Sequence, residues 1–333
     1  MTDKPIIGVT MGDPAGVGPE IVARAVASPE VRETARVVVF GTASLMERAL
    51  ALVSAGIDVN RVSRVSESSF SSRAVDVLDV APAAGSVKPG VIQGSAGQAA
   101  FEYVSRAISS CLAGEIDAIA TAPINKESLR AGAVPYLDHT EMLGKLTDSP
   151  DPMTLFVLDK MRIFFLTRHV PLEEACRLIT HDRVLEGLKR ANESMRDLGV
   201  PAPRIAVAGL NPHAGDGGLF GTQDDHEIAP AVARARELGV DAYGPIAADS
   251  VFFQNRNGRF DAVLSLYHDQ GHIAAKTVDF ERTISVTLGI PFLRTSVDHG
   301  TAFDIAWKGL ASAVGMAEAI KVAAAYAPLF SPK

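Results

Sequence analysis

The chain has 333 residues, of which 47% are hydrophobic and 21% are charged, and its formal net charge is −7. This composition supports a large core or two domains of roughly 150 residues each, and it excludes a disordered chain. An acidic chain has no general field that attracts nucleic acid or an anionic membrane surface, so we expect neither as a partner. The sequence shows no membrane-length apolar run and no signal-peptide pattern, which predicts a cytoplasmic protein.

Short β-branched runs alternate along the chain with longer amphipathic stretches. Strands are predicted at Ile6–Thr10, Arg36–Phe40, Ala118–Thr121, Thr154–Leu158, Ile163–Leu166, Ile205–Ala208 and Ala262–Ser265, and Ile284–Leu288 is strand-like. Helices are predicted at Pro19–Ala27, Ser44–Ala55, Gln98–Leu112, Leu172–Thr180, Val184–Leu198 and Glu227–Leu238. Several of the strands are apolar throughout, as expected of parallel strands covered on both faces. The alternation predicts an α/β fold.

A glycine-rich segment, Gly12 to Glu20, follows the first predicted strand. Pro19 suits the first turn of a helix because its missing N–H costs nothing there, and Glu20 suits the positive end of that helix. The segment is either a structural strand-to-helix turn or part of a binding site. It is not a GxGxxG turn, and no other segment supplies a full dinucleotide fingerprint.

Three histidines each follow a predicted strand, namely His169, His213 and His268. Ligands of open α/β sheets gather at the carboxyl ends of the strands. Three imidazoles delivered there are able to bind Zn²⁺ or another divalent ion and to leave a coordination position for a substrate. A single histidine is more often a structural residue, and these three are distant in sequence, so that interpretation stays open for each.

Cations and a hydroxyl group offer a second candidate site. His139 is followed by Thr140, and Lys276, Arg282 and Arg294 follow His268 along the chain. A phosphate monoester requires this combination of cations and hydroxyl donors. The alternative is a solvated charged face, above all for Arg282.

Two carboxylates and a glycine-dense loop complete the candidates. Asp249 and Asp269 are candidates for metal binding, substrate binding or proton transfer, and either is equally a possible helix cap or turn residue. The segment Gly215–Thr222 holds four glycines and leads toward a predicted helix. Its N–H groups are able to hold a cofactor phosphate, or it is a mobile lid.

Six collinear segments together closely resemble the 4-hydroxythreonine-4-phosphate dehydrogenases of pyridoxal phosphate biosynthesis and their paralogues. They are GDPAGVGPE (12–20), TAPINK (121–126), DHTEML (138–143), NPHAGDGGLFG (211–221), YHDQGH (267–272) and RTSVDHGTAFDIA (294–306). The resemblance implies two α/β/α lobes with a central cleft, like isocitrate and isopropylmalate dehydrogenases, and a homodimer. We expect residues 1–130 and 290–333 to form the first lobe. Residues 131–289 should form the second, with most of the metal and substrate residues.

The resemblance also assigns roles to single residues. It implies that His169, His213 and His268 bind a divalent metal (zinc, or magnesium, cobalt or manganese) in a site shared across the dimer interface. It implies NAD binding by an adenosine loop that includes His299, Gly300, Thr301 and Asp304. The substrate positions that match are His139, Thr140, Lys276 and Arg294, with Ser285 where the family usually has Asn. Two further departures are Asp138 and Trp307, each at a position where Gly is common.

The implied reaction is an NAD-dependent and metal-dependent oxidation and decarboxylation of a small phosphorylated hydroxy acid. The first expectation is 4-hydroxy-L-threonine 4-phosphate, which gives 3-amino-2-oxopropyl phosphate. The alternative, which Ser285 favours, is D-threonate or D-erythronate 4-phosphate, which gives dihydroxyacetone phosphate. Asp249, Asp269 and Lys126 are the candidates for proton transfer.

Two other classes of function remain. A metal-dependent lyase or hydrolase without redox chemistry would leave the HGTAFDIA segment without a purpose. A ligand-binding protein without catalysis would not need three imidazoles placed for a metal.

Overall fold

The computed structural model describes residues 4–81 and 86–331, and the chain divides into two compact units. Unit 1 is formed by the chain up to Pro152 and from Ile284 onward, and unit 2 is Met153–Thr283. Each unit has a sheet of mostly parallel strands with helices packed on it, so the α/β class is confirmed. None of the helices in the described ranges is long and apolar enough to cross a membrane.

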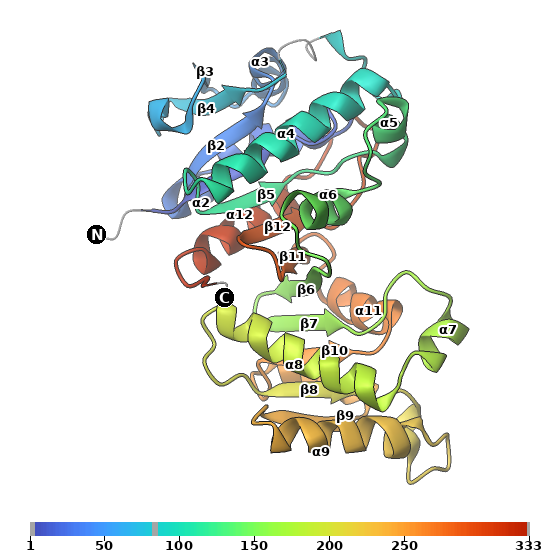
Figure 1. Ribbon diagram of the computed structural model, residues 1–333. Helices are drawn as coiled ribbons and strands as arrows, with labels where there is room; N and C mark the ends of the chain where they lie inside the picture. The colour runs from blue at the N-terminus through green and yellow to red at the C-terminus, as the bar shows by residue number, and fades with distance from the viewer. Residues whose placement is uncertain (1–3, 82–85, 332–333) are drawn as a thin grey trace. The chain divides into compact units, whose positions relative to one another are not determined.

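The sheet of unit 1 has the order β3-β4-β2-β1-β5-β12-β11, and only β11 and β12 pair antiparallel. Its strands are β1 (Ile6–Thr10), β2 (Arg36–Gly41), β3 (Asp58–Val62), β4 (Ala74–Asp79), β5 (Ala118–Thr121), β11 (Ile284–Leu288) and β12 (Leu293–Val297). Its α-helices are α1 (Gly18–Ala27), α2 (Pro29–Thr34), α3 (Ala43–Leu52), α4 (Gly94–Leu112), α5 (Lys126–Ala131), α6 (His139–Leu146) and α12 (Val314–Tyr326). Figure 1 shows α4 lying across β2 and β5, and α4 contacts these strands and β1.

The sheet of unit 2 has the order β6-β7-β10-β8-β9, with an antiparallel β6–β7 hairpin and parallel pairing elsewhere. Its strands are β6 (Met153–Leu158), β7 (Met161–Phe165), β8 (Ile205–Ala208), β9 (Ala242–Ile246) and β10 (Ala262–Ser265). Its α-helices are α7 (Leu172–Arg177), α8 (His181–Asp197), α9 (Ala229–Glu237), α10 (Ala248–Arg256) and α11 (His268–Val278). Figure 1 shows α8 crossing the sheet in front of β10 and β8, which it contacts.

Hydrophobic spacing explains the elements that the sequence predicts. Helix α8 buries Val184, Leu188, Ala191 and Met195 completely, and these positions recur at the spacing of one helical face. The central strands β1, β5, β8 and β10 are buried along nearly their whole length, as parallel strands between helical layers must be. All seven predicted strands are confirmed, as is the strand-like region at β11.

The unit boundaries differ from those expected. Residues 131–152 belong to unit 1 because helix α6 packs against α4, and residues 284–289 belong there because β11 pairs along its length with β12. The expected boundaries fell at 130 and 290. The difference moves His139, Thr140 and Ser285 from the expected second lobe into unit 1. Unit 2 therefore keeps the three strand-end histidines and Lys276, and the other candidate substrate residues lie in unit 1.

Candidate active site

Three adjacent parallel strands bring the candidate histidines of unit 2 to one edge of its sheet. Strands β7, β10 and β8 are neighbours, and His169, His268 and His213 follow their carboxyl ends. Backbone pairing continues past β7 and β10, where Leu166 N donates to Ser265 O at 2.8 Å and Thr167 N donates to Leu266 O at 3.2 Å. This continuation keeps the two chain segments side by side as they leave the sheet.

His169 and His268 form a pair at this edge. Their ring centroids are 5.8 Å apart, and both residues line one cavity of about 390 Å³ with Tyr267 and Asp269. The Asp269 carboxylate lies 2.6 Å from His268 Nδ1, which leaves His268 Nε2 as the ring nitrogen available to a ligand. Asp269 therefore orients an imidazole here, and its side chain is otherwise largely exposed.

His272 stacks on the face of the His268 ring. It lies one helical turn further along α11, and the two rings stack at 3.6 Å with an interplanar angle of 13°. His272 also contacts Phe156 and Phe165, at ring-centroid distances of 4.3 Å and 4.6 Å. Sequence reasoning did not assign a role to His272, although its i, i+4 spacing from His268 on a helix was the signal.

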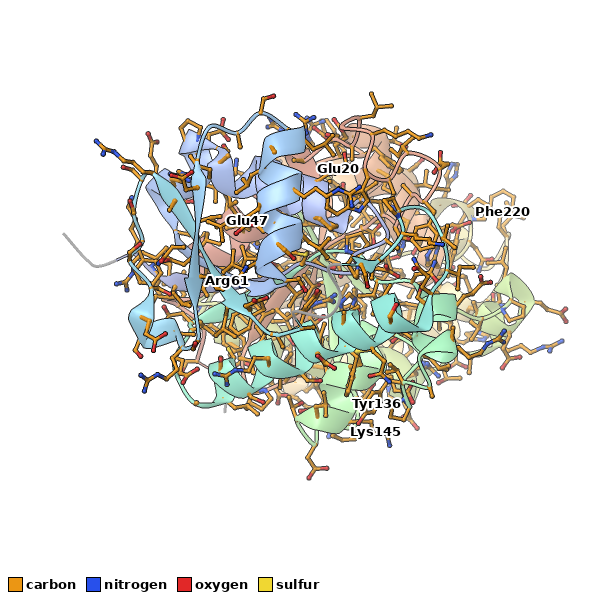
Figure 2. The ribbon with its side chains drawn as sticks, turned by 90° about the horizontal axis from the view of Figure 1, so that it is seen from above. Glu20, Glu47, Arg61, Tyr136, Lys145 and Phe220 are labelled. Carbon is orange, nitrogen blue, oxygen red and sulfur yellow. The ribbon has the colours of Figure 1, made fainter. Side chains whose placement is uncertain are left out.

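His213 lies in an unusual turn after β8. Positive φ angles run without interruption from His213 to Gly218, a left-handed turn that the three glycines of this run favour. The buried carboxylate of Asp224 anchors the base of the turn by accepting hydrogen bonds from Leu210 N at 2.8 Å and Asn211 N at 3.0 Å. His213 itself is exposed, with Phe220 6.3 Å from its ring (labelled in Figure 2).

These side chains are candidates for part of a metal site. Paired imidazoles suit a divalent transition metal such as Zn²⁺, which takes four ligands. In residues 4–81 and 86–331, no group of three or more His, Cys, Asp or Glu side chains is placed to hold an ion. The chemistry of the pair therefore fits a metal, and completing the site requires a further ligand from a moved segment or from a second copy of the chain.

A buried arginine forms the centre of the candidate site in unit 1. Arg294 on β12 is 5% exposed, and its guanidinium donates to Thr121 Oγ1 at 2.6 Å and 3.1 Å and to Thr287 Oγ1 at 3.0 Å. Both threonines lie on the neighbouring strands β5 and β11. Burial lowers the pKa of Arg294 to about 10, with Asp138 and Asp298 acting in the opposite direction. The side chain thus remains a cation near neutral pH.

His139 lies within electrostatic reach of Arg294. Burial, and secondarily the Arg294 charge, hold the pKa of His139 well below its ordinary value, so the imidazole is neutral. Its Nε2 atom is buried without a hydrogen-bond partner in the protein. A buried cation beside an unsatisfied imidazole nitrogen suits an anionic ligand that accepts hydrogen bonds.

Asp138 organises the start of α6 and connects it to Lys126. Its carboxylate caps the helix by accepting from Glu141 N at 3.1 Å, and it lies 3.5 Å from Lys126 Nζ. With φ −161° the backbone of Asp138 is extended, so the departure from glycine costs no strain. Thr140 is half-buried beside His139, and Ser285 on β11 is half-buried opposite Ser296 of β12.

The remaining candidates lie in unit 2. Lys276 is on α11, two turns beyond His268, with its Nζ 5.1 Å from the centre of the Phe280 ring. Asp249 is exposed in the first turn of α10, where a carboxylate favours the positive end of the helix. Asp249 is not the helix cap, which is Ala247, so its position fits the turn-residue interpretation.

The proposed cofactor segment, His299–Asp304, is anchored on the glycine-rich segment Gly12–Glu20. Thr301 O accepts from Val17 N at 3.0 Å, and a Cβ at Gly16 would lie 2.8 Å from Thr301 O, so only glycine fits there. The buried Glu20 accepts from Gly309 N at 2.9 Å through Oε2. The segment Gly12–Glu20 is thus a strand-to-helix turn that also supports the candidate cofactor segment, whose residues His299, Gly300 and Asp304 are exposed.

Trp307 has a φ of 60°, in the left-handed region that favours glycine. This conformation costs an L-residue about 1–2 kcal/mol. The indole N–H donates to Pro14 O at 2.9 Å, and the Arg48 guanidinium lies 4.3 Å from the ring centre. A hydrogen bond and a cation–π contact contribute about 0.5–1.5 and 0.5–1 kcal/mol, which is enough to offset the strain.

Comparisons with known proteins agree with the motif pattern. Residues 33–323 match the family model of the pyridoxal phosphate biosynthetic protein PdxA. The chain is 52% identical over 335 residues to a protein of Halalkalibacterium halodurans named D-threonate 4-phosphate dehydrogenase, covering 99% of each chain. A relative of the same name from Symbiobacterium thermophilum is 51% identical, again over 99% of each chain. The solved 4-hydroxythreonine-4-phosphate dehydrogenase of Klebsiella pneumoniae is 41% identical with a TM-score of 0.89, covering 97% of this chain and 99% of that one.

Proposed function

The chain belongs to the PdxA family, and from that premise we propose that it oxidises and decarboxylates D-threonate 4-phosphate with NAD. It is an enzyme, a dehydrogenase of this family, which implies a nicotinamide dinucleotide as redox partner. The family resemblance stated from the motifs is confirmed. The sequence placed 4-hydroxy-L-threonine 4-phosphate first, and the relatives at 51–52% identity instead support the threonate alternative.

The main observation in favour of a phosphorylated substrate is the buried Arg294 cation of unit 1. Arg294 donates to two threonine hydroxyls, and the nearby His139 has a buried, unsatisfied Nε2. A phosphate or carboxylate oxygen that accepts from these groups compensates the buried charge. We place the anionic end of the substrate here, with Thr140 as an additional hydroxyl donor.

Ser285 supports the choice between the two acids. Its hydroxyl both donates and accepts hydrogen bonds, and it replaces the amide that the family usually presents. A hydroxyl group on carbon 2, as in threonate, matches such a partner as well as an ammonium group does. Recognition at carbon 2 is therefore relaxed toward hydroxy acids, and D-erythronate 4-phosphate is the next expected substrate.

In the proposed reaction, hydride leaves the substrate carbon for NAD⁺ and the hydroxyl proton leaves with it, which produces a ketone β to the carboxylate. Loss of CO₂ then leaves an enolate, which takes up a proton. A divalent metal, when bound, supplies the charge that favours both the alkoxide and the enolate. His169 and His268 would hold it, and Asp269 keeps the His268 ring oriented through Nδ1.

Lys126 is our choice for the proton transfer. Its Nζ lies 3.5 Å from Asp138, a carboxylate that acts on the pKa of Arg294. By contrast, Asp269 contacts His268, and Asp249 lies in the first turn of α10. His139, neutral because of burial, is able to donate through Nε2 or accept there without a change of charge. Residues that hold the two ends of the substrate also fix its carbon against the nicotinamide.

A substrate panel tests this proposal. Purified protein with NAD⁺ and Zn²⁺, Mg²⁺, Mn²⁺ or Co²⁺ is mixed with D-threonate, D-erythronate and 4-hydroxy-L-threonine 4-phosphates, and NADH absorbance gives kcat/KM for each. We expect the highest value for D-threonate 4-phosphate. A higher value for 4-hydroxy-L-threonine 4-phosphate would return the assignment to the first expectation. Product formation without NADH would instead identify the metal-dependent lyase.

We also propose that the active enzyme is a homodimer with a shared metal site. His169 and His268 lie together in one chain, and the described part of that chain supplies no third ligand. We therefore propose that the third ligand is His213 from a second copy of the chain. Mixing inactive His213→Ala and His268→Ala variants should restore activity. Half of the dimers are then mixed and each has one intact site, so about a quarter of the activity should return. No recovery, or a fully active monomer, would contradict the shared site.

A further inference from the structure

The only tryptophan of the chain connects the proposed cofactor segment to two other parts of unit 1. Trp307 is joined to Pro14 of the glycine-rich segment by its indole hydrogen bond and to α3 by the Arg48 guanidinium over its ring. Both contacts come from the side chain. They form only when the segment around residue 307 is docked against residues 12–20 and α3.

The backbone of the segment has its own anchors, which do not involve the tryptophan. Val17 N donates to Thr301 O at 3.0 Å, Gly309 N donates to Glu20 Oε2 at 2.9 Å, and Arg24 donates to Gly309 O at 2.6 Å. These contacts tie down both ends of residues 301–309. A change at Trp307 therefore leaves the segment attached and alters how freely its middle moves.

A glycine at position 307 would adopt the left-handed conformation at no cost, in the docked state and in many others. A tryptophan at φ 60° is strained, so that conformation persists only because Pro14 and Arg48 hold the ring. Tryptophan in place of glycine therefore restricts the backbone at position 307 to the conformation in which its side chain is held. The residues just before it, Thr301–Asp304, are those to which the cofactor role is assigned.

We propose that Trp307 and Arg48 are positioning residues for the dinucleotide, which hold the proposed cofactor segment, His299–Asp304, in its binding conformation before the cofactor arrives. A segment ordered in advance loses less entropy on binding, so this positioning increases affinity without touching the nicotinamide. The inference rests on the proposed function, because it takes His299–Asp304 to be the cofactor segment.

Arg48 and its neighbours provide matched variants. Glu47 is adjacent to Arg48 on α3 but faces Arg61 of β3, with a closest N–O distance of 3.9 Å (Figure 2). Arg48→Ala removes the cation over the indole, whereas Glu47→Ala and Arg61→Ala remove exposed charges of the same region that do not contact it. Trp307→Phe keeps the ring and removes the hydrogen bond, and Trp307→Ala removes both contacts while keeping the backbone strain.

The test is a titration of each full-length variant with NADH and NAD⁺ by calorimetry. Wild-type protein is also followed by the emission of its single tryptophan, which NADH quenches because it absorbs where indole emits. We expect Kd to rise roughly tenfold in Trp307→Ala and about threefold in Trp307→Phe and Arg48→Ala, and to stay unchanged in the Glu47 and Arg61 variants. In assays the effect should appear in KM for the cofactor more than in kcat.

Trp307→Gly distinguishes the positioning of the cofactor segment from a general effect on stability. Glycine relieves the left-handed strain, so this variant should unfold at a higher temperature than Trp307→Ala and still bind the cofactor about as weakly. Equal Kd in wild type, Trp307→Ala and Arg48→Ala would overturn the inference. A wild-type protein that binds neither NAD nor NADP would instead overturn the proposed function. Arg48 is exposed, so its variant keeps the test available if Trp307→Ala does not fold.

Discussion

Arg294 of unit 1 and the candidate metal-binding histidines of unit 2 are positioned in opposite ways. Arg294 is 5% exposed and bonded to hydroxyls on both neighbouring strands, so its position is fixed by the sheet itself. His169 and His213 are exposed and lie on loops after their strands, and only the former is paired with His268. Arg294 has its hydrogen-bond partners within its own sheet, whereas the histidines depend on loop positions.

The difference shows how a sheet places charged groups. Neighbouring strands deliver hydroxyls to a guanidinium within hydrogen-bond distance because strands lie about 4.8 Å apart. Loops that leave the same edge diverge, so side chains several residues beyond the strand ends do not converge without another contact. The proposed anion site is therefore preformed in one chain, while the proposed metal site would need a further ligand.

The largest expected effect comes from the candidate metal-binding histidines. His213→Ala or His268→Ala should abolish metal binding and lower kcat/KM on the order of a thousandfold or more, because the ion stabilises the charge that develops during the reaction. Metal content by mass spectrometry and turnover measure this. His213 is exposed, so the melting temperature of its variant should change little.

The exposed His226 provides the control, since His226→Ala should keep both metal and activity. If a variant with all three of His169, His213 and His268 replaced by alanine retained full metal content and turnover, the metal assignment would be wrong.

Arg294→Met should have the next largest effect. It removes the buried cation at similar volume, and kcat/KM for the phosphorylated acids should fall on the order of a hundredfold or more. In wild type, unphosphorylated threonate should be a very poor substrate, and the variant should lose this discrimination. Arg282→Ala is the matched control, because Arg282 is an exposed cation paired with Asp279. Equal wild-type activity on the unphosphorylated acid would contradict a phosphate site at Arg294.

Ser285→Asn should have a moderate effect on specificity. The longer amide restores the group usual in the family, and the ratio of kcat/KM for 4-hydroxy-L-threonine 4-phosphate to that for D-threonate 4-phosphate should rise about tenfold. Ser285→Ala, which removes the hydroxyl without adding an amide, should lower activity on threonate 4-phosphate and leave the amino acid no better. An unchanged ratio in Ser285→Asn would show that residue 285 does not discriminate between an amino and a hydroxyl group at carbon 2 of the substrate.

The smallest expected effect is a pH dependence of stability. The pKa of His139 is lowered in the folded protein, so the unfolded chain binds the extra proton first. The free energy of unfolding is therefore not reduced above the unfolded pKa of His139, about 6.5. It falls as pH drops below that value, by no more than about 1.4 kcal/mol per pH unit. Unfolding measured from pH 7.5 to 5.5 should show a flatter profile in His139→Gln than in wild type and in the exposed control His226→Gln. Identical slopes in all three proteins would contradict the buried neutral imidazole.

Two of the four described strands that the sequence missed share a cause, whereas β4 and β12 lie inside their sheet. Strand β3 (Asp58–Val62) carries three polar or charged residues, and β9 (Ala242–Ile246) contains a glycine and a proline, so neither shows an apolar run. Both lie at the ends of their sheets, where one side pairs with no strand of the same unit. Strand β12 was missed because it buries Arg294 where a strand pattern requires an apolar residue.

By itself the sequence determined the α/β class, most of the strands and the family, because apolar periodicity and the order of motifs are properties of the chain read along its length. Only the tertiary structure decided that Arg294 meets Thr121, 173 positions earlier, and that His272 stacks on His268. It also decided that α6 and β11 join unit 1 and that the glycine-rich segment 12–20 supports Thr301. These contacts depend on strand order and on close packing between distant segments, which local pattern does not encode.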